Sequence, residues 1–153
     1  MTSAVHELSR EHWVRAPLER AFDFFSDAFK LEAVTPPWLA FHMLTRAPVE
    51  VGAGTLLDYR LRVHGVPVRW RTRIETWEPP NRFVDRQLKG PYKLWVHTHT
   101  FEARDGGTVV GDHVRYALPL GPLGELAHRV VVRRDLERIF DYRHEALTRL
   151  LGE

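Results

Sequence analysis

The sequence predicts an α+β fold in which a curved antiparallel sheet wraps around one long C-terminal helix. Apolar and polar residues alternate through the middle of the chain, which is typical of half-buried antiparallel strands. Apolar residues recur at helical spacing near the N-terminus and again, over a longer stretch, at the C-terminus. Only the long helix is large enough to cover the apolar face of such a sheet, so the sheet has to curl around it.

The composition is that of an ordinary globular protein. The 153 residues are 44% hydrophobic and 27% charged, which fits one domain over residues 1–153. No apolar run approaches the roughly 18 residues of a membrane span, and the first residues lack the apolar core of a signal peptide. We therefore expect a cytoplasmic location. Cysteine is absent, which excludes disulfides and cysteine nucleophiles.

The first elements are a strand and two short helices. Residues 7–15 are rich in β-compatible residues, and Pro17 then suits the first turn of a helix. Helical spacing of apolar residues predicts that this helix runs over residues 18–28. A second short helix, over residues 30–34, has to end before Pro36, because a residue that precedes proline avoids helical geometry.

Strands follow, and then the long helix. Alternation predicts strands over residues 57–63 and 68–75 with a turn at Gly65, after a short strand within residues 41–47. Further strands cover residues 82–89, 93–103 and 108–118, separated by Gly90-Pro91 and by Asp105-Gly106-Gly107. After Pro122 the chain is helical to its end, with an apolar side formed by Leu126, Val130, Val132, Leu136, Ile139, Phe140, Leu147 and Leu150.

Several motifs in this order resemble those of a known superfamily. The run APLERAFDFF at residues 16–25 resembles the opening helix of the SRPBCC superfamily, which comprises START-like, pollen-allergen-like and polyketide-cyclase-like helix-grip proteins. One bacterial branch of single-domain members has similar runs to TPPWL (35–39), GPY (90–92), WVHTHTF (95–101), DHVRY (112–116) and RRDLERIFDYRH (133–144). The resemblance implies the helix-grip fold and a cavity for a hydrophobic or amphipathic small molecule, in some members with chemistry added.

The most informative stretch is the strand that holds two histidines. Side chains alternate between the faces of a strand, so Trp95, His97, His99 and Phe101 share one face. The two aromatic residues that bracket the histidines indicate that this is the inner face. The next strand places Asp112 and Tyr116 on a single face as well.

Two registers between these strands stay open. A tight turn at Gly106-Gly107 places His99 opposite Val114, whereas a four-residue loop places it opposite Asp112. In both registers Asp112 lies beside or diagonal to His99, and a buried carboxylate needs a partner, so we expect an Asp–His contact. On the neighbouring strand, the family pattern favours an inward Asp85, whereas a two-residue turn at Gly90-Pro91 favours inward Val84 and Leu88.

Three interpretations of His97 and His99 also stay open. They are core histidines with satisfied hydrogen bonds, polar anchors for a ligand in an apolar cavity, or acid–base groups or metal ligands. The His-x-His spacing is usable for a metal, but no third ligand is placed except Asp112, and we predict no metal. The chain has no phosphate loop, dinucleotide fingerprint or nucleophile elbow, so we predict no cofactor.

The predicted function is binding, and potentially transport or sequestration, of a hydrophobic or amphipathic molecule such as a lipid, polyketide or isoprenoid. The predicted ligand-binding residues are Tyr59, Trp70, Trp95, His97, His99, Phe101, Asp112, Tyr116 and Phe140. The alternative is an enzyme of cyclase, dehydratase or aromatase type in which His97, His99, Asp112 and Tyr116 act as acid and base. A third class is an interaction module that works through an arginine face or as a homodimer.

The remaining features are surface arginines and the segments that border the predicted cavity. An arginine stripe, which consists of Arg60, Arg62, Arg69, Arg71 and Arg73, predicts a solvated outer face of the sheet. Because no stacking aromatics lie among these arginines, we expect no nucleic-acid partner, and membrane contact that is at most peripheral. The segment Trp38, Leu39, Phe41 and Met43 either gates the cavity or belongs to the core. Arg143 is expected to extend to solvent rather than to reach a ligand.

Overall fold

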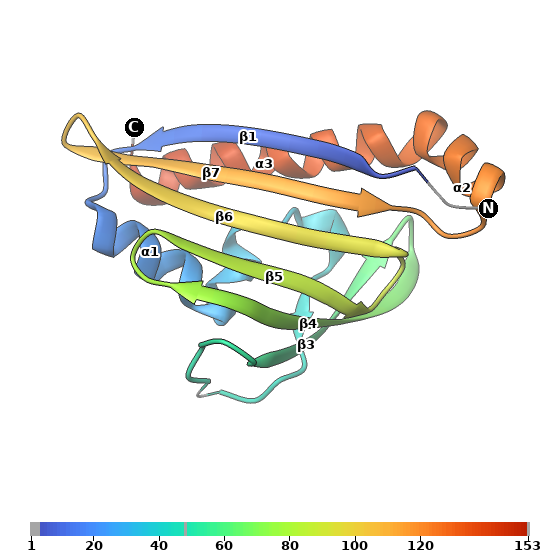
Figure 1. Cartoon of the computed structure of the whole chain (residues 1–153), viewed down its shortest axis with the longest axis horizontal. Helices are drawn as coiled ribbons and strands as arrows, with labels where there is room; N and C mark the ends of the chain where they lie inside the picture. Colours follow the sequence, from blue (N-terminus) through green and yellow to red (C-terminus); the bar gives the residue numbers. More distant parts are fainter. Residues whose placement is uncertain (1–3, 48, 153) are drawn as a thin grey trace.

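The structure is a computed structural model that describes residues 4–47 and 49–152. Seven antiparallel strands form one open, curved sheet in the order β1-β7-β6-β5-β4-β3-β2 (Figure 1). A C-terminal helical segment of 31 residues, from Gly121 to Leu151, runs along the sheet beside β1 and β7. The predicted architecture is confirmed. The strands are β1 (His6–Val14), β2 (His42–Met43), β3 (Leu56–Val63), β4 (Val66–Glu78), β5 (Arg82–Lys89), β6 (Leu94–Arg104) and β7 (Gly107–Ala117).

Two short helices follow β1, as predicted, although their form differs. Helix α1 (Leu18–Ser26) ends where the Asp27 side chain accepts a hydrogen bond from the backbone nitrogen of Phe29, which begins the 3-10 helix η1 (Ala28–Val34). A further 3-10 turn, η2 (Pro37–Leu39), follows the double proline. The strand predicted within residues 41–47 is reduced to the two residues of β2.

Tight turns set the register of the two hairpins that carry most of the inner face. The turn between β3 and β4 consists of His64 and Gly65, and both have positive φ angles of 49° and 80°. Asp105 and Gly106, with φ angles of 53° and 79°, form the turn between β6 and β7. Positive φ at both central positions is the type I′ geometry that matches the twist of antiparallel strands.

The observed β6–β7 register is the one that places His99 opposite Asp112. The sequence associated this register with a four-residue loop, whereas the structure reaches it with a two-residue turn one position earlier, because the aspartate adopts the left-handed conformation. Asp85 also faces inward, opposite His97, which resolves the open orientation of β5.

The C-terminal segment consists of α2 (Gly121–Ala127), a π-helical turn at His128–Val132 and α3 (Arg133–Leu151). The prediction that Leu126, Val130 and Leu150 belong to its apolar inner side is wrong, since these three side chains are exposed. Leu136, Phe140 and Leu147 are buried as predicted. No helix in the described part of the chain is long and apolar enough to cross a membrane.

Two aromatic clusters fill the space between the sheet and α3. One, near the C-terminal end of α3, packs Phe22 and Phe101 against Leu147. The other joins Trp70 and Trp95 to Phe140. Phe22, Phe101 and Leu147 line no part of the cavity that the second cluster helps to form, so they are a closed core.

Candidate functional site

A cavity of about 630 Å³ lies between the sheet and the C-terminal helices. A volume of this size suits a drug-sized ligand. The walls are mostly aliphatic and aromatic and come from η1, η2, β3, β4, β5, β6, the π turn, α3 and the connecting loops. The lining residues are Leu31, Val34, Thr35, Trp38, Leu39, Phe41, Tyr59, Leu61, Val63, His64, Gly65, Trp70, Asp85, Pro91, Tyr92, Trp95, His97, His99, Leu118, Val132, Asp135, Leu136, Arg138, Ile139, Phe140 and Arg143.

Six of the nine predicted ligand-binding residues line this cavity: Tyr59, Trp70, Trp95, His97, His99 and Phe140. Phe101 does not. It lies in the closed core, where its ring meets the edge of Phe22 with centroids 5.2 Å apart. Phe101 shares its strand face with His97 and His99, but the cavity ends before it because α1 covers that end of the sheet.

Because Phe101 lies outside the cavity, a substitution there should affect the stability of the protein but not its affinity for a ligand. We expect Phe101→Leu to lower the free energy of unfolding by about 1 kcal/mol, because it removes ring contacts in a closed core. The affinity for a ligand in the cavity should stay unchanged. Urea denaturation and a binding titration of the same variant check the two parts, and a large loss of affinity without a loss of stability would contradict the assignment.

Tyr116 is also separated from the two histidines on which its predicted acid–base role depends. Its hydroxyl is hydrogen-bonded to Nε2 of His128, in the π turn, at 2.8 Å. Burial raises the pKa of this hydroxyl, so it stays protonated. Tyr116 therefore does not join His97, His99 and Asp112 in the predicted acid–base group, because its hydroxyl is hydrogen-bonded to His128 of the C-terminal helical segment.

Five buried or half-buried polar side chains meet at one end of the cavity, and we call them the polar cluster: Asp85, His97, His99, Asp112 and Arg143. Nε2 of His97 donates to Asp112 at 2.7 Å, and Nε2 of His99 donates to Asp85 at 2.7 Å. The two imidazole rings stack with centroids 3.7 Å apart.

Arg143 connects the cluster to α3. Its Nε donates to Oδ2 of Asp112 at 3.3 Å, and its Nη2 forms an ion pair with Oδ1 of the same carboxylate at 3.2 Å. Its guanidinium lies 4.9 Å from the centre of the Phe25 ring. The prediction that Arg143 extends to solvent is wrong, because a carboxylate in the interior would otherwise lack a cationic partner. Asp112 itself does not line the cavity. It holds Arg143 and His97, which do.

The charges of the cluster follow from burial and from these contacts. Burial acts to raise the pKa of Asp112, but Arg143 and the two histidines outweigh it and hold the pKa well below its usual range. Burial also acts to raise the pKa of Asp85, but the hydrogen bond and charge of His99 lower it. Burial, assisted by His97, lowers the pKa of His99 to about 4. At neutral pH both carboxylates are ionised and His99 is neutral.

This protonation pattern defines hydrogen-bonding roles. Neutral His99 carries its proton on Nε2, which faces Asp85, so its Nδ1 is an acceptor for Nη2 of Arg143 at 3.5 Å. His97 carries a proton on the Nε2 that faces Asp112. No residue in the described ranges bonds to Nδ1 of His97, and this imidazole lines the cavity.

The same residues include a geometric candidate for a metal site. Ligand atoms of Asp85, His97 and His99 lie within 4.8 Å of one another, so the third member is Asp85 rather than the predicted Asp112. The two imidazole planes differ by only 20°, however, and stacked rings direct their in-plane lone pairs side by side rather than toward one point. Each Nε2 also faces a carboxylate. The geometry favours hydrogen bonding over coordination.

Two residues of the walls that were not among the predicted ligand-binding residues are Tyr92 and Val132. Tyr92 enters the cavity wall because the side chain of Gln87 bonds both its backbone oxygen, at 2.7 Å, and its backbone nitrogen, at 3.1 Å. Val132 reaches the cavity from the π turn. Trp38 stands at the rim, half exposed, with the guanidinium of Arg138 5.0 Å from its ring centre.

A family model described as polyketide cyclase / dehydrase and lipid transport matches residues 14–141. The chain belongs to this family. A search of curated proteins found no match. The family match agrees with the helix-grip architecture and with a cavity for hydrophobic small molecules.

Several solved structures share the fold. Protein CV1439 from Chromobacterium violaceum has a TM-score of 0.74 at 13% identity, over 96% of this chain and 97% of that chain. The di-domain ARO/CYC StfQ from the steffimycin biosynthetic pathway has a TM-score of 0.73 at 19% identity, over 96% of this chain and 51% of that chain. TTHA0849 from Thermus thermophilus has a TM-score of 0.66 at 24% identity, over 93% of this chain and 97% of that chain.

Proposed function

We propose that this family member reversibly binds an amphipathic small molecule, with an apolar ring system or chain in the aromatic part of the cavity and a polar end at the polar cluster. Lipids, polyketides and isoprenoids all have this chemistry. The observation that supports the proposal most directly is that a cavity of about 630 Å³ with mostly apolar walls ends in buried, hydrogen-bonded polar groups. Such a pairing gives affinity through apolar burial and orientation through a few polar contacts.

The polar end is chemically asymmetric, and this narrows the ligand. Arg143 offers donors whose charge is balanced by Asp112, and His97 offers an acceptor at Nδ1. A ligand hydroxyl or phenol suits these groups, since it can donate to the imidazole and accept from the guanidinium. A dianionic headgroup such as a phosphate would lie near two ionised carboxylates and is disfavoured.

The test is whether the protein carries or takes up such a molecule. Native mass spectrometry of protein purified from its own host should show a bound species that organic solvent releases. Titration with 2-naphthol, which is fluorescent and has one hydroxyl on an apolar ring system, should show saturable binding. A protein that retains nothing and binds 2-naphthol only in proportion to its concentration would refute the proposal.

Acid–base catalysis of the cyclase or dehydratase type is the second candidate, favoured by the two Asp–His hydrogen bonds at 2.7 Å. It would have to operate without Tyr116. A histidine with a pKa of about 4 is also a weak base at neutral pH, where a value near the working pH is most effective. We therefore rank binding first. If catalysis occurs, His99→Ala should abolish turnover and preserve ligand affinity.

A further inference from the structure

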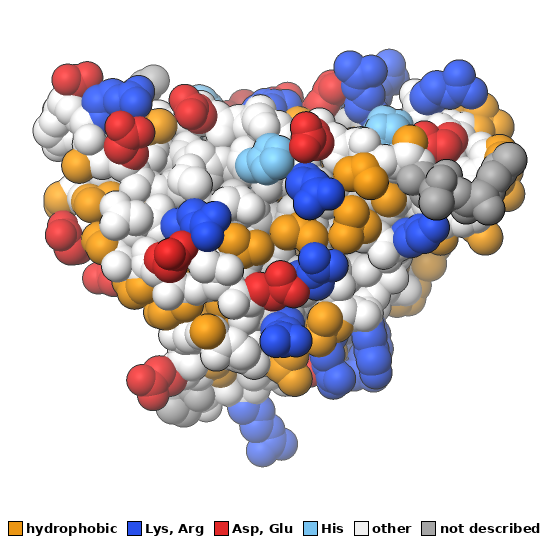
Figure 2. All heavy atoms as spheres, in the orientation of Figure 1, with side chains coloured by type: hydrophobic (Ala, Val, Ile, Leu, Met, Phe, Trp, Pro, Cys, Tyr) orange, Lys and Arg blue, Asp and Glu red, His pale blue; other side chains and the backbone are white. Residues whose placement is uncertain are grey.

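The segment from the end of β7 through the π turn exposes an apolar stripe, which we call the α2 stripe: Leu120, Leu123, Leu126 and Val130. Their exposed fractions are 73%, 64%, 50% and 64%. The spacing of three and four residues places Leu123, Leu126 and Val130 on one side of the helical segment, and Leu120 immediately precedes it. Figure 2 shows apolar side chains beside basic ones at this corner of the molecule.

The outward orientation of the α2 stripe is fixed by contacts on the other side of the helix. On the opposite side of the same helical segment, His128 is hydrogen-bonded to Tyr116 of the sheet. The carboxylate of Glu125 accepts a hydrogen bond from Nε2 of His6 at 3.0 Å. Gly124 packs so closely that a Cβ there would collide with the carbonyl oxygen of Pro119. These contacts hold the helix in one orientation, with the stripe outward.

The first residue of the stripe carries an additional structural cost. Leu120 has a φ of 72°, a left-handed conformation that a bulky side chain rarely adopts. Its side chain is the most exposed of the large hydrophobic residues in the described chain. Backbone strain of this kind concentrates at functional positions, where it presents a side chain in a particular direction.

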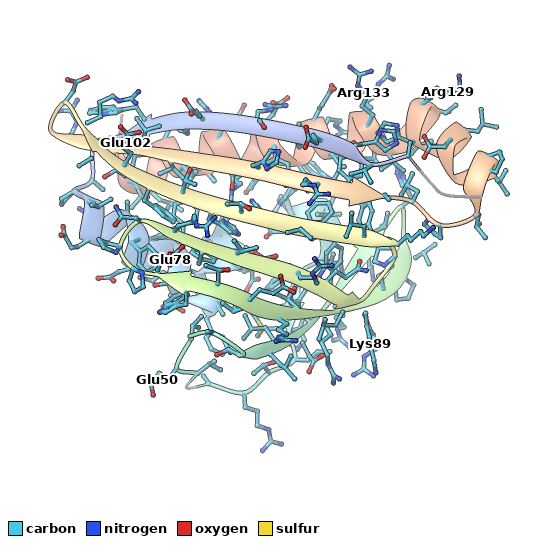
Figure 3. All side chains as sticks on the ribbon, in the orientation of Figure 1. Glu50, Glu78, Lys89, Glu102, Arg129 and Arg133 are labelled. Atoms are coloured by element: carbon cyan, nitrogen blue, oxygen red, sulfur yellow. The ribbon has the colours of Figure 1, made fainter. Side chains whose placement is uncertain are left out.

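Three exposed arginines accompany the stripe: Arg129, Arg133 and Arg134. Figure 3 shows Arg129 and Arg133 directed away from the sheet. Arg133 lies 3.4 Å from Glu137, whereas no acidic group in the described ranges pairs with Arg129 or Arg134. Two copies of the chain joined through this face would bring their arginines together, which is unfavourable, whereas an anionic surface would attract them.

We propose that the α2 stripe and its arginines dock the protein on an anionic lipid bilayer. Aliphatic side chains on one side of a helix, with arginines beside them, are the chemistry by which peripheral helices enter the boundary between headgroups and acyl chains. Leu118, which precedes α2, and Val132, in the π turn, line the cavity, so docking would bring this part of the cavity wall near the membrane. The proposal stands independently of the identity of the ligand.

The experiment is co-sedimentation of the full chain with vesicles of equal parts phosphatidylcholine and phosphatidylglycerol, compared with vesicles of phosphatidylcholine alone. The protein should prefer the anionic vesicles, and the preference should weaken as salt is added. Leu123→Ser/Leu126→Ser should lower partitioning at least roughly tenfold, because the inserting apolar groups are removed. Arg129→Glu/Arg134→Glu should lower it by at least roughly fivefold for each lost charge.

Matched control variants alter residues of the same types elsewhere. Leu56→Ser/Leu150→Ser removes two other exposed leucines, and Arg60→Glu/Arg69→Glu reverses two exposed arginines on the outer face of the sheet. Both should sediment like the wild type. Equal losses in stripe and control variants, or no preference of the wild type for anionic vesicles, would overturn the proposal.

A dimer in analytical ultracentrifugation that Leu123→Ser/Leu126→Ser dissociates would also overturn it, because the stripe would then belong to a second copy of the chain. The 2-naphthol titration keeps the two proposals apart. The stripe variants should bind 2-naphthol normally, and a variant that loses 2-naphthol binding in the cavity should still sediment with anionic vesicles.

Discussion

Replacing Arg143 with methionine is expected to lower the free energy of unfolding by about 3–5 kcal/mol at neutral pH, because it leaves a buried charge without its partner. Asp112 is 8% exposed and ionised, and Arg143, at 3.2 Å, is its cationic neighbour. Methionine keeps most of the apolar volume of the side chain, so the loss reports on the charge rather than on a cavity. Urea denaturation followed by tryptophan fluorescence measures it.

The pH dependence has a definite sign. In the wild type the pKa of Asp112 is held below its unfolded value of about 3.9, so its contribution is present above that value and is lost as the pH falls through the folded pKa. Without Arg143, burial raises the pKa of Asp112, and the carboxyl takes up a proton at a higher pH. The stability difference between Arg143→Met and the wild type should therefore be largest at neutral pH and should narrow on acidification.

Two further variants identify the cause. Asp112→Asn/Arg143→Met removes both charges, and it should recover much of the lost stability while an amide oxygen still accepts from His97. Arg149→Met, which replaces an exposed arginine on the same helix, should change stability by less than about 0.5 kcal/mol. A loss of under about 1 kcal/mol in Arg143→Met would place this pair among exposed ion pairs and contradict the argument.

The inward orientation of Arg143 is a feature of the site that the sequence did not predict. Strand alternation predicted that His97, His99 and Asp112 face inward, because a period of two leaves only two choices. It placed Asp112 beside or diagonal to His99 and predicted an Asp–His contact, but the hydrogen bonds pair the residues differently. His99 lies opposite Asp112, yet it bonds Asp85, and His97 bonds Asp112 diagonally. Arg143 belongs to α3, which is far from β7 in the sequence, and it forms an ion pair with Asp112.

The helix shows a different limit. Counting back from Leu136 in steps of about 3.6 residues predicts that positions near 129 and 125 face the sheet. The buried residues are instead His128 and Gly124. The π turn at His128–Val132 contains one extra residue, which shifts the phase by one position and turns Leu126 and Val130 outward. Periodicity alone contains no signal for such an insertion, so the α2 stripe could be found only in the structure.

The fold was more predictable than the site, because it rests on patterns repeated over many residues. Seven strands and the long helix follow from alternation, helical spacing and two I′ turns, each a local property of the sequence. Solved structures at 13–24% identity have the same architecture. The polar cluster depends instead on single residues from four separate elements, β5, β6, β7 and α3. We therefore expect these few positions to contribute most to the choice of ligand by this family member.

His97 should decide whether the cavity distinguishes a polar ligand from an apolar one. We expect His97→Phe to lower the affinity for 2-naphthol roughly ten- to hundredfold, because a buried hydrogen bond to the ligand hydroxyl is lost, at a cost of about 1–3 kcal/mol. The affinity for naphthalene, which has no hydroxyl, should stay within about threefold of the wild type, since phenylalanine preserves the ring that stacks on His99. Competition titrations with both probes measure the ratio.

The matched control is His113→Phe, a histidine that projects from the outer face of β7 near Glu7. It should leave both affinities unchanged. Equal losses for 2-naphthol and naphthalene in His97→Phe would mean that His97 only shapes the cavity, and the polar cluster would then be a structural feature of the core. A selective loss for 2-naphthol would instead make Nδ1 of His97 the atom that recognises the polar end of the ligand, because its Nε2 is already engaged by Asp112.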